Sequence, residues 1–191
     1  MKFIIIIISM VLVNNYPLAQ FLGICPFLGV SKDLDSSTGM GIAVTFVMVL
    51  ATAVTWPIQQ LLNRFGIGYL QTVVFILVIA ALVQLVEMFM KKSMPALYKS
   101  LGIFLPVITT NCAVLGVCIT NIDSSYNYIE SLVNAFGAGI GFLFAMVVMA
   151  GVRTKLVDQS RIPESFRGVP IVLITAAILS LSFMGFNGMF S

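Results

Sequence analysis

Two cysteines carry the pattern in this chain that is best suited to chemistry. Cys25 and Cys112 each begin the sequence Cys-x-x-Leu-Gly-Val, and the two copies lie 87 residues apart inside long apolar stretches. Thiolate sulfur is a soft ligand that suits zinc and the iron of iron–sulfur clusters. Because matched thiols have few other uses in hydrocarbon, the repeat indicates redox metal chemistry within a membrane.

Several interpretations of Cys25 and Cys112 remain open from the residues alone. Free cysteines can pack as small hydrophobic residues, although a matched motif argues against this, and a disulfide is less attractive near the middle of a membrane. Zinc prefers four closed ligands, and the chain has no histidine. A 2Fe-2S cluster also needs four ligands, usually thiolates, so a second copy or a homologous subunit would supply two. Cys118 has no counterpart in the first half, and we expect it to pack.

Composition identifies the class of protein that positions these thiols. Apolar residues make up 60% of the 191 residues and charged residues 9%, whereas a soluble domain has about 25% charged residues. A spanning helix needs about 20 apolar residues. The chain is therefore predicted to be an all-α integral membrane protein, with six transmembrane helices near 3–29, 39–62, 69–90, 100–120, 131–152 and 168–188.

The two halves of the chain are predicted to form an inverted 3+3 repeat. A single membrane domain, 1–191, divides into repeats of approximately 1–92 and 93–191, and each carries one cysteine motif. Three spans per half place the second repeat in the membrane from the opposite side. Inverted repeats build their sites near the midplane from interrupted helices, so the spans with Cys25 and Cys112 should meet there.

Spans 1 and 4 carry the interruptions. Proline and adjacent polar residues are poor helix interiors, and Pro26 suits the first position of a new helix with Cys25 at its cap. Polar side chains beside both cysteines are candidates for capping these breaks or for a transient ion-coupling site: Asn14, Asn15, Thr109, Thr110 and Asn111. Glu87 lies one turn before Lys91, so an interfacial pair is expected rather than an ion carrier.

Basic residues predict the orientation. One side of a six-span arrangement holds only Lys2 and Arg64, and the other side holds the remaining eight basic residues. The positive-inside rule places both termini outside and the odd-numbered loops in the cytoplasm. A basic loop beside the lipid bilayer accounts for the net charge of +3, so no nucleic-acid partner is expected.

Long stretches of the chain resemble the family of A subunits of the Rnf complex and, less closely, the E subunit of the sodium-pumping NADH:quinone reductase. The resemblance covers essentially the whole chain and is carried by residues 13–15, 21–32, 101–106, 108–116 and 183–186. It implies a multi-pass subunit of a ferredoxin:NAD+ oxidoreductase in a bacterial or archaeal cytoplasmic membrane. Such a complex couples electron transfer to the export of Na+ or H+.

The resemblance also implies a cofactor and partners. Cys25 and Cys112 would provide half of a 2Fe-2S cluster shared with the homologous E subunit, and electrons would pass from the B subunit toward the G subunit, with the C and D subunits completing the route. No catalytic residue and no flavin or nucleotide site is expected in this chain. The run from Gly137 to Gly141 is interpreted as helix packing by small residues. The alternative function is a secondary transporter or channel-like inverted-repeat protein without a redox centre.

Overall fold

The computed structural model describes residues 2–29, 31, 34–93, 107–108, 110–155, 163, 166 and 168–185. Helices make up nearly all of these residues, and the described part contains no strand. The prediction of an all-helical protein is confirmed for this part of the chain. Helical residues occur within each of the six predicted spans.

The first predicted span is broken into several helical pieces. Helix α1 (Lys2–Ile8) continues into a π-helical turn, η1 (Ser9–Val13), and the chain then breaks before α2 (Tyr16–Ala19) and again before α3 (Ile24–Gly29). The predicted interruption is therefore present. Helix α3 begins at Ile24, two residues before the predicted start, so Cys25 lies in the first turn of the helix rather than at its cap.

Longer helices follow this broken segment. Their bounds are α4 (Leu34–Phe65), the short 3-10 helix η2 (Gly68–Leu70), α5 (Gln71–Ser93), α8 (Cys112–Asp123), α9 (Tyr128–Lys155) and α10 (Val169–Met184). Helix α4 is followed by Gly66 at φ +70°, a left-handed position that commonly ends a helix. Pro106 lies outside the described residues, and Asn111 begins α8 with an extended backbone.

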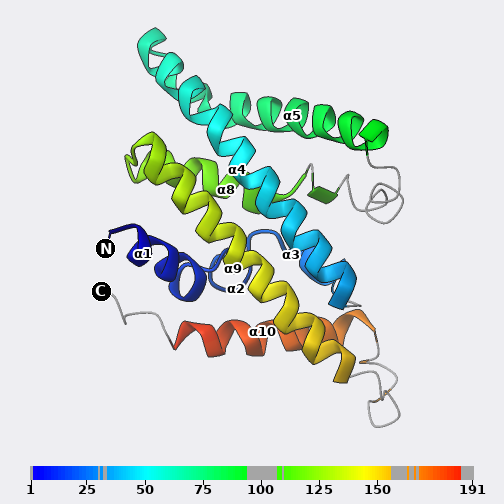
Figure 1. Ribbon diagram of the computed structural model, residues 1–191. Coiled ribbons are helices and arrows are strands. Elements are labelled where there is room, and N and C mark those ends of the chain that lie inside the picture. The colour runs from blue at the N-terminus through cyan, green and yellow to red at the C-terminus, as the bar shows by residue number, and fades with distance from the viewer. Residues whose placement is uncertain are drawn as a thin grey trace.

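The antiparallel helices α4 and α9 form the centre of the molecule (Figure 1). Small residues bring them close together. An added Cβ at Gly139 would lie 2.5 Å from Thr45 Cγ2, and one at Gly41 would lie 3.0 Å from Leu143. A Cβ added at Gly137 would lie 3.2 Å from the Ile7 Cα, so this glycine allows α1 to approach α9. The prediction of small-residue packing between 137 and 141 is confirmed.

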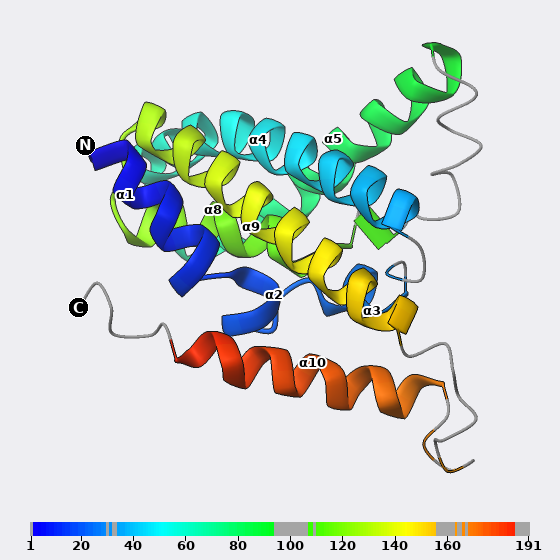
Figure 2. The same ribbon diagram turned by 60° about the horizontal axis from the view of Figure 1, so that its bottom comes forward.

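The other helices surround this pair. Helices α1 and η1 pack on α9, α8 packs on α4 and α9, and α10 lies beside α2 (Figure 2). Ser180 Oγ on α10 donates a hydrogen bond to the Leu18 carbonyl at 2.5 Å. The beginning of α1 and the end of α10 lie on the same side of the molecule as the α4–α5 and α8–α9 connections (Figure 1).

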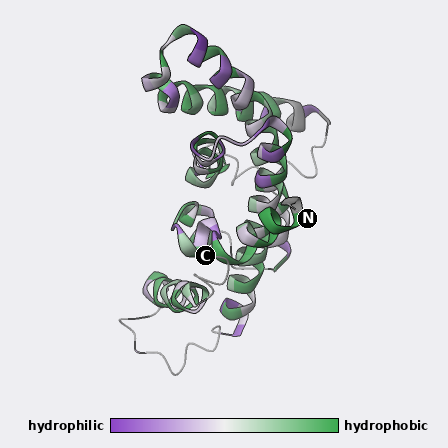
Figure 3. Cartoon of the chain, turned by 90° about the vertical axis from the view of Figure 1, so that its left-hand side faces the viewer, coloured by the Kyte–Doolittle hydropathy of each residue, from purple (hydrophilic) through white to green (hydrophobic). Residues whose placement is uncertain are grey.

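The outer surfaces of the helices are strongly apolar. Figure 3 shows hydrophobic residues along most of the helices, with hydrophilic positions gathered where α4 ends, at the top of the view. Within the described residues, three helical segments could cross a membrane by length and composition: Leu34–Phe65, Gly68–Met88 and Tyr128–Lys155. The same residues include three shorter apolar helical segments at Ile4–Val13, Cys112–Asp123 and Val169–Met184. These features are compatible with a multi-pass membrane protein.

Candidate iron–sulfur half-site and its polar surroundings

Cys25 lies in the first turn of α3 and is exposed on the surface of the chain. The preceding connection has two left-handed residues, Phe21 at φ +57° and Gly23 at φ +81°. A bulky residue with positive φ is uncommon and costs conformational energy. The chain therefore reaches Cys25 through a strained, tightly fixed bend.

Cys112 is the first residue of α8 and is also exposed. Asn111 precedes it as the N-cap, and its Oδ1 accepts a hydrogen bond from the Ala113 N–H at 3.0 Å. This side chain satisfies one of the free amides of the first turn. The Cys112 Sγ lies 4.0 Å from the Thr110 carbonyl oxygen, a long contact that leaves the thiol available.

The two cysteine segments pack directly against each other. A Cβ added to Gly23 would lie 2.9 Å from Asn111 Oδ1 and 3.0 Å from the Ala113 Cβ. Gly23 is two residues before Cys25, and Asn111 and Ala113 stand on either side of Cys112. Since two residues span at most about 7 Å, the beginnings of α3 and α8 are near neighbours.

A second contact along α8 strengthens this arrangement. A Cβ at Gly116 would lie 2.7 Å from Leu22 Cδ1 and 3.4 Å from the ring of Tyr16. The glycine of the second motif copy therefore makes room for the interrupted segment of the first repeat. Two broken helices, 87 residues apart in sequence at their cysteines, form one packed unit.

The far end of α3 is held by a basic side chain. Arg153 Nη1 donates hydrogen bonds to the Leu28 carbonyl at 2.8 Å and to Ser31 Oγ at 2.9 Å. Ser31 Oγ in turn donates to the Phe27 carbonyl at 2.6 Å. A cation at a helix C-terminus interacts favourably with the last carbonyl groups. Arg153 thus fixes the short helix that carries Cys25 to the last turn of α9.

Two of the predicted polar residues are buried at the breaks. Asn15 is fully buried, and its Nδ2 donates to the carbonyls of Val11 at 3.0 Å and Gly141 at 2.9 Å. Asn111 is 4% exposed and caps α8. Among the described residues, Asn15 Oδ1 and Asn111 Nδ2 each lack a hydrogen-bond partner. Both side chains stabilise the helix breaks, and each has one polar atom that could still bind another group.

The remaining predicted polar residues are placed differently. Asn14 is exposed, with Nδ2 at 3.5 Å from Ser9 Oγ, and Thr110 is exposed in the turn before α8. Thr109 lies outside the described residues. Glu87 is partly buried on α5, and the side chain of its predicted partner Lys91 is not described.

The third cysteine has a different environment. Cys118 is 1% exposed and belongs to the hydrophobic core, with its Sγ 3.9 Å from Thr52 Oγ1. Within the described ranges, no three Cys, Asp or Glu side chains gather into a metal-binding group. What these ranges offer is a pair of exposed thiols. Two thiolates fit one half of the usual four-thiolate ligand set of a 2Fe-2S cluster.

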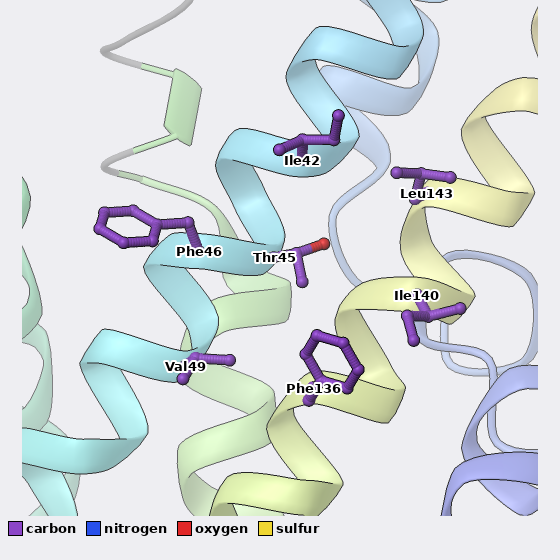
Figure 4. A pocket seen from close by; sticks show the side chains of 7 residues that line it. All are labelled: Ile42, Thr45, Phe46, Val49, Phe136, Ile140 and Leu143. Carbon is purple, nitrogen blue, oxygen red and sulfur yellow. The ribbon is translucent and has the colours of Figure 1, made fainter.

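An apolar groove between α4 and α9 lies apart from this pair. Figure 4 shows side chains from both helices around it, and its volume is about 460 Å³. Among the described lining residues Thr45 alone is polar, and its Oγ1 already donates to the Gly41 carbonyl at 2.7 Å. The groove therefore has hydrocarbon walls and is a poor ligand set for an ion.

Two contributors to the site could not be predicted from the sequence. Arg153 belongs to the basic residues that set the orientation, and no local pattern indicates that it reaches α3. Gly23 fits the pattern of a helix breaker, whereas in the structure it is the point where the two cysteine segments touch. Gly23 is not part of the repeated motif, because the residue at the corresponding position before Cys112 is Thr110. Comparison of the two motif copies therefore does not point to it.

Comparison with known proteins places this geometry in a family. Residues 3–190 match the family described as Rnf-Nqr subunit, membrane protein. The chain belongs to this family of membrane proteins.

Individual relatives are similar over the whole chain. The chain is 55% identical over 190 residues to the A subunit of the Na(+)-translocating ferredoxin:NAD(+) oxidoreductase complex of Acetobacterium woodii, covering 99% of this chain and 98% of the relative. It is 57% identical over 187 residues to the A subunit of the ion-translocating oxidoreductase complex of Syntrophotalea carbinolica, covering 97% and 96%. The resemblance to A subunits of the Rnf complex is confirmed.

Proposed function

We propose that this chain is an electron-carrying membrane subunit of an ion-pumping ferredoxin:NAD+ oxidoreductase. Cys25 and Cys112 hold one half of an intramembrane 2Fe-2S cluster, and a homologous E subunit holds the other half. Bound to these thiolates, such a cluster would supply one-electron transfer. Relatives named as subunits of ion-translocating oxidoreductases support the assignment to a complex.

The observation that carries the proposal is the packing of Gly23 against Asn111 and Ala113. It brings the beginnings of two cysteine helices together while leaving both thiols exposed. Thiols that served only as packing would be buried, as Cys118 is at 1% exposure. Exposure on an apolar surface suits ligands that complete their site with a partner chain.

The helix ends also favour an anionic ligand set. Cys25 and Cys112 lie in the first turns of α3 and α8, where the positive end of the helix dipole stabilises negative charge. A cluster with four thiolates is an anion, and burying it in hydrocarbon without compensation would be costly. The N-termini of the two helices offset part of this cost.

The order of helices in the two halves supports the inverted-repeat arrangement. Each half has an interrupted helix that carries a cysteine, then a long helix, α4 or α9, and then a further apolar helix. Helices α4 and α9 run in opposite directions (Figure 1). With the basic residues facing the cytoplasm, both termini lie outside a bacterial or archaeal cytoplasmic membrane.

Ion coupling is assigned to the polar residues at the breaks. Asn15 and Asn111 are buried beside the thiol-bearing segments, and each retains a polar atom without a partner among the described residues. Electrostatic interactions strengthen in a low-dielectric interior, so the charge of a cluster held by Cys25 and Cys112 would change the affinity of a nearby Na+ or H+ site. Asn14, Thr109 and Thr110 complete this proposed set. The B, C, D and G subunits complete the proposed electron route.

Quantifying iron and acid-labile sulfide in the purified complex tests this function. Cys25→Ser and Cys112→Ser should each remove the iron and sulfide attributable to one 2Fe-2S cluster. Cys118→Ser is the matched control, because Cys118 packs in the core and should leave both quantities unchanged. Unchanged iron in either of the first two variants would reject the ligand assignment, and a complex without this cluster would favour a transporter without a redox centre.

A further inference from the structure

A polar pocket lies at the end of the molecule where α4 and α8 finish. Its volume is about 210 Å³, and it is lined by the last turns of both helices and the connection to α9, with Trp56, Gln59, Asn121 and Tyr126 among its residues. This is also the end where hydrophilic positions gather in Figure 3. The described residues that line the pocket include no carboxylate.

Gln59 lines this pocket and has an unused side-chain oxygen. Gln59 is 4% exposed. Its Nε2 donates to Asn63 Oδ1 at 3.1 Å and to Gln71 Oε1 at 3.3 Å, so both amide protons are occupied. Gln59 Oε1 has no hydrogen-bond partner in the described part of the chain. A buried amide oxygen without a donor is costly, and a bound cation would satisfy it.

A pair of buried asparagines, Asn121 in the pocket lining and Asn134 bonded to it, provides a second unused acceptor. Asn121 Nδ2 donates to the Ser131 carbonyl at 3.3 Å, and because a carbonyl only accepts, the amide orientation of Asn121 is fixed. Asn121 Oδ1 then accepts from Asn134 Nδ2 at 2.6 Å. Asn134 is fully buried, and its Oδ1 is left without a partner among the described residues.

The chemistry of these oxygens selects a monovalent cation. Calcium and magnesium sites rely on carboxylates, whereas neutral amide and carbonyl oxygens are used for alkali cations in membrane proteins. The pocket has room for an ion with several waters, since a water occupies about 30 Å³ in the liquid. At the same end of the molecule, the described helix ends carry two carboxylates, Asp123 and Glu130, against one arginine, Arg64, and this excess of negative charge raises the local cation concentration.

We propose that this amide pocket is an outer Na+-binding vestibule, with Gln59 Oε1 as a ligand and Asn121 and Asn134 as its polar support. The orientation predicted from the basic residues places the pocket on the outer side, where an exported ion would leave. The assignment rests on the proposed export of a cation. It concerns different residues from those proposed for coupling at the breaks.

Trp56 provides the probe for a test. It is the only tryptophan of the chain, it lines the pocket, and its Nε1 donates to the Tyr126 carbonyl at 3.1 Å. The purified complex would be titrated with NaCl at constant ionic strength, with choline chloride as the replacement salt. The signal is the difference in tryptophan emission between this complex and one carrying Trp56→Phe.

The expected result is a saturable Na+ response that choline does not produce. Gln59→Leu should raise the half-saturating Na+ concentration roughly tenfold, and Gln59→Glu should lower it. Gln84→Leu is the matched control, because Gln84 is exposed on α5 and should leave the titration unchanged. No Na+ response, equal responses to both salts, or an unchanged titration in Gln59→Leu would overturn the proposal and leave a water-filled pocket.

The 2Fe-2S signal of each Gln59 variant separates this proposal from the proposed function. A normal cluster signal shows that the variant complex is assembled, so a lost Na+ response then reports the pocket alone. Conversely, if the Cys112→Ser test rejects the cluster assignment, the Na+ titration of the pocket can still be interpreted. The two proposals can therefore fail independently.

Discussion

The two cysteine segments share a sequence motif but are held in place by different means. Cys112 begins a 12-residue helix whose own N-cap, Asn111, closes its first turn. Cys25 lies on a six-residue helix that is fixed at its far end by Arg153 of α9. A short helix cannot hold its own geometry. The comparison shows that one half-site is supported locally and the other by tertiary contacts.

The largest effect is expected where the two segments meet. In Gly23→Ala, the new Cβ would lie within 3.0 Å of Phe142 and Asn111, and the backbone is left-handed at φ +81°. Overpacking costs about 1–3 kcal/mol, in addition to about 1 kcal/mol for the left-handed backbone. We expect a lower melting temperature of the complex and loss of cluster iron.

Gly66→Ala isolates the backbone contribution in this experiment. Gly66 has a similar φ of +70°, but a Cβ there meets nothing within 4 Å among the described residues. This variant should lose only the stability that a left-handed backbone costs alanine, and it should retain its iron. Equal loss of iron in both variants would contradict the proposed contact between the segments.

Removal of the tertiary support should affect the Cys25 segment selectively. Arg153→Gln loses charge-assisted hydrogen bonds to Leu28 and Ser31, each worth about 1.5–3 kcal/mol. Hydrogen exchange of the α3 amides in the complex should become at least roughly tenfold faster, while exchange in α8 stays the same. Arg64→Gln, which changes an exposed arginine at the end of α4, serves as the control. Acceleration of both helices to the same extent would show that their supports are shared.

Removing the local support of the Cys112 segment should have a smaller effect, and this effect should appear mainly in α8. Asn111→Ala removes the N-cap of α8, at a cost of about 1 kcal/mol. Exchange in the first turn of α8 should increase more than exchange in α3, and Asn111→Ser should restore most of the protection. Faster exchange in α3 rather than α8 would reverse the proposed division between local and tertiary support.

The helical regions are well predicted from the sequence because charged and polar residues are so sparse. Leu34–Phe65 and Tyr128–Lys155 enclose the predicted spans 39–62 and 131–152, extending a turn or so past the apolar limits because helices continue into polar residues. The break at Asn14 and Asn15 is also predictable, since adjacent amides compete with helical hydrogen bonds.

Other parts of the site depend on contacts between distant residues and could not be predicted. Arg153 and Leu28 lie 125 residues apart, and an arginine near a membrane surface has an ordinary role in orientation. The unpartnered oxygens of Gln59 and Asn134 depend on the amide bonds of Gln59 to Gln71 and of Asn134 to Asn121, each on another helix, and such pairing leaves no pattern in sequence. The left-handed conformation of Phe21 could not be predicted from the sequence either, because a bulky residue rarely takes this conformation.

The central claim is that Cys25 and Cys112 together hold one half of a shared 2Fe-2S cluster. Electron paramagnetic resonance of the reduced complex with and without Cys112 tests it most directly, with Cys118→Ser as the control. We expect Cys112→Ser to remove or shift the signal of one 2Fe-2S cluster and Cys118→Ser to leave it intact. A 2Fe-2S signal that is unchanged in Cys112→Ser would contradict the claim.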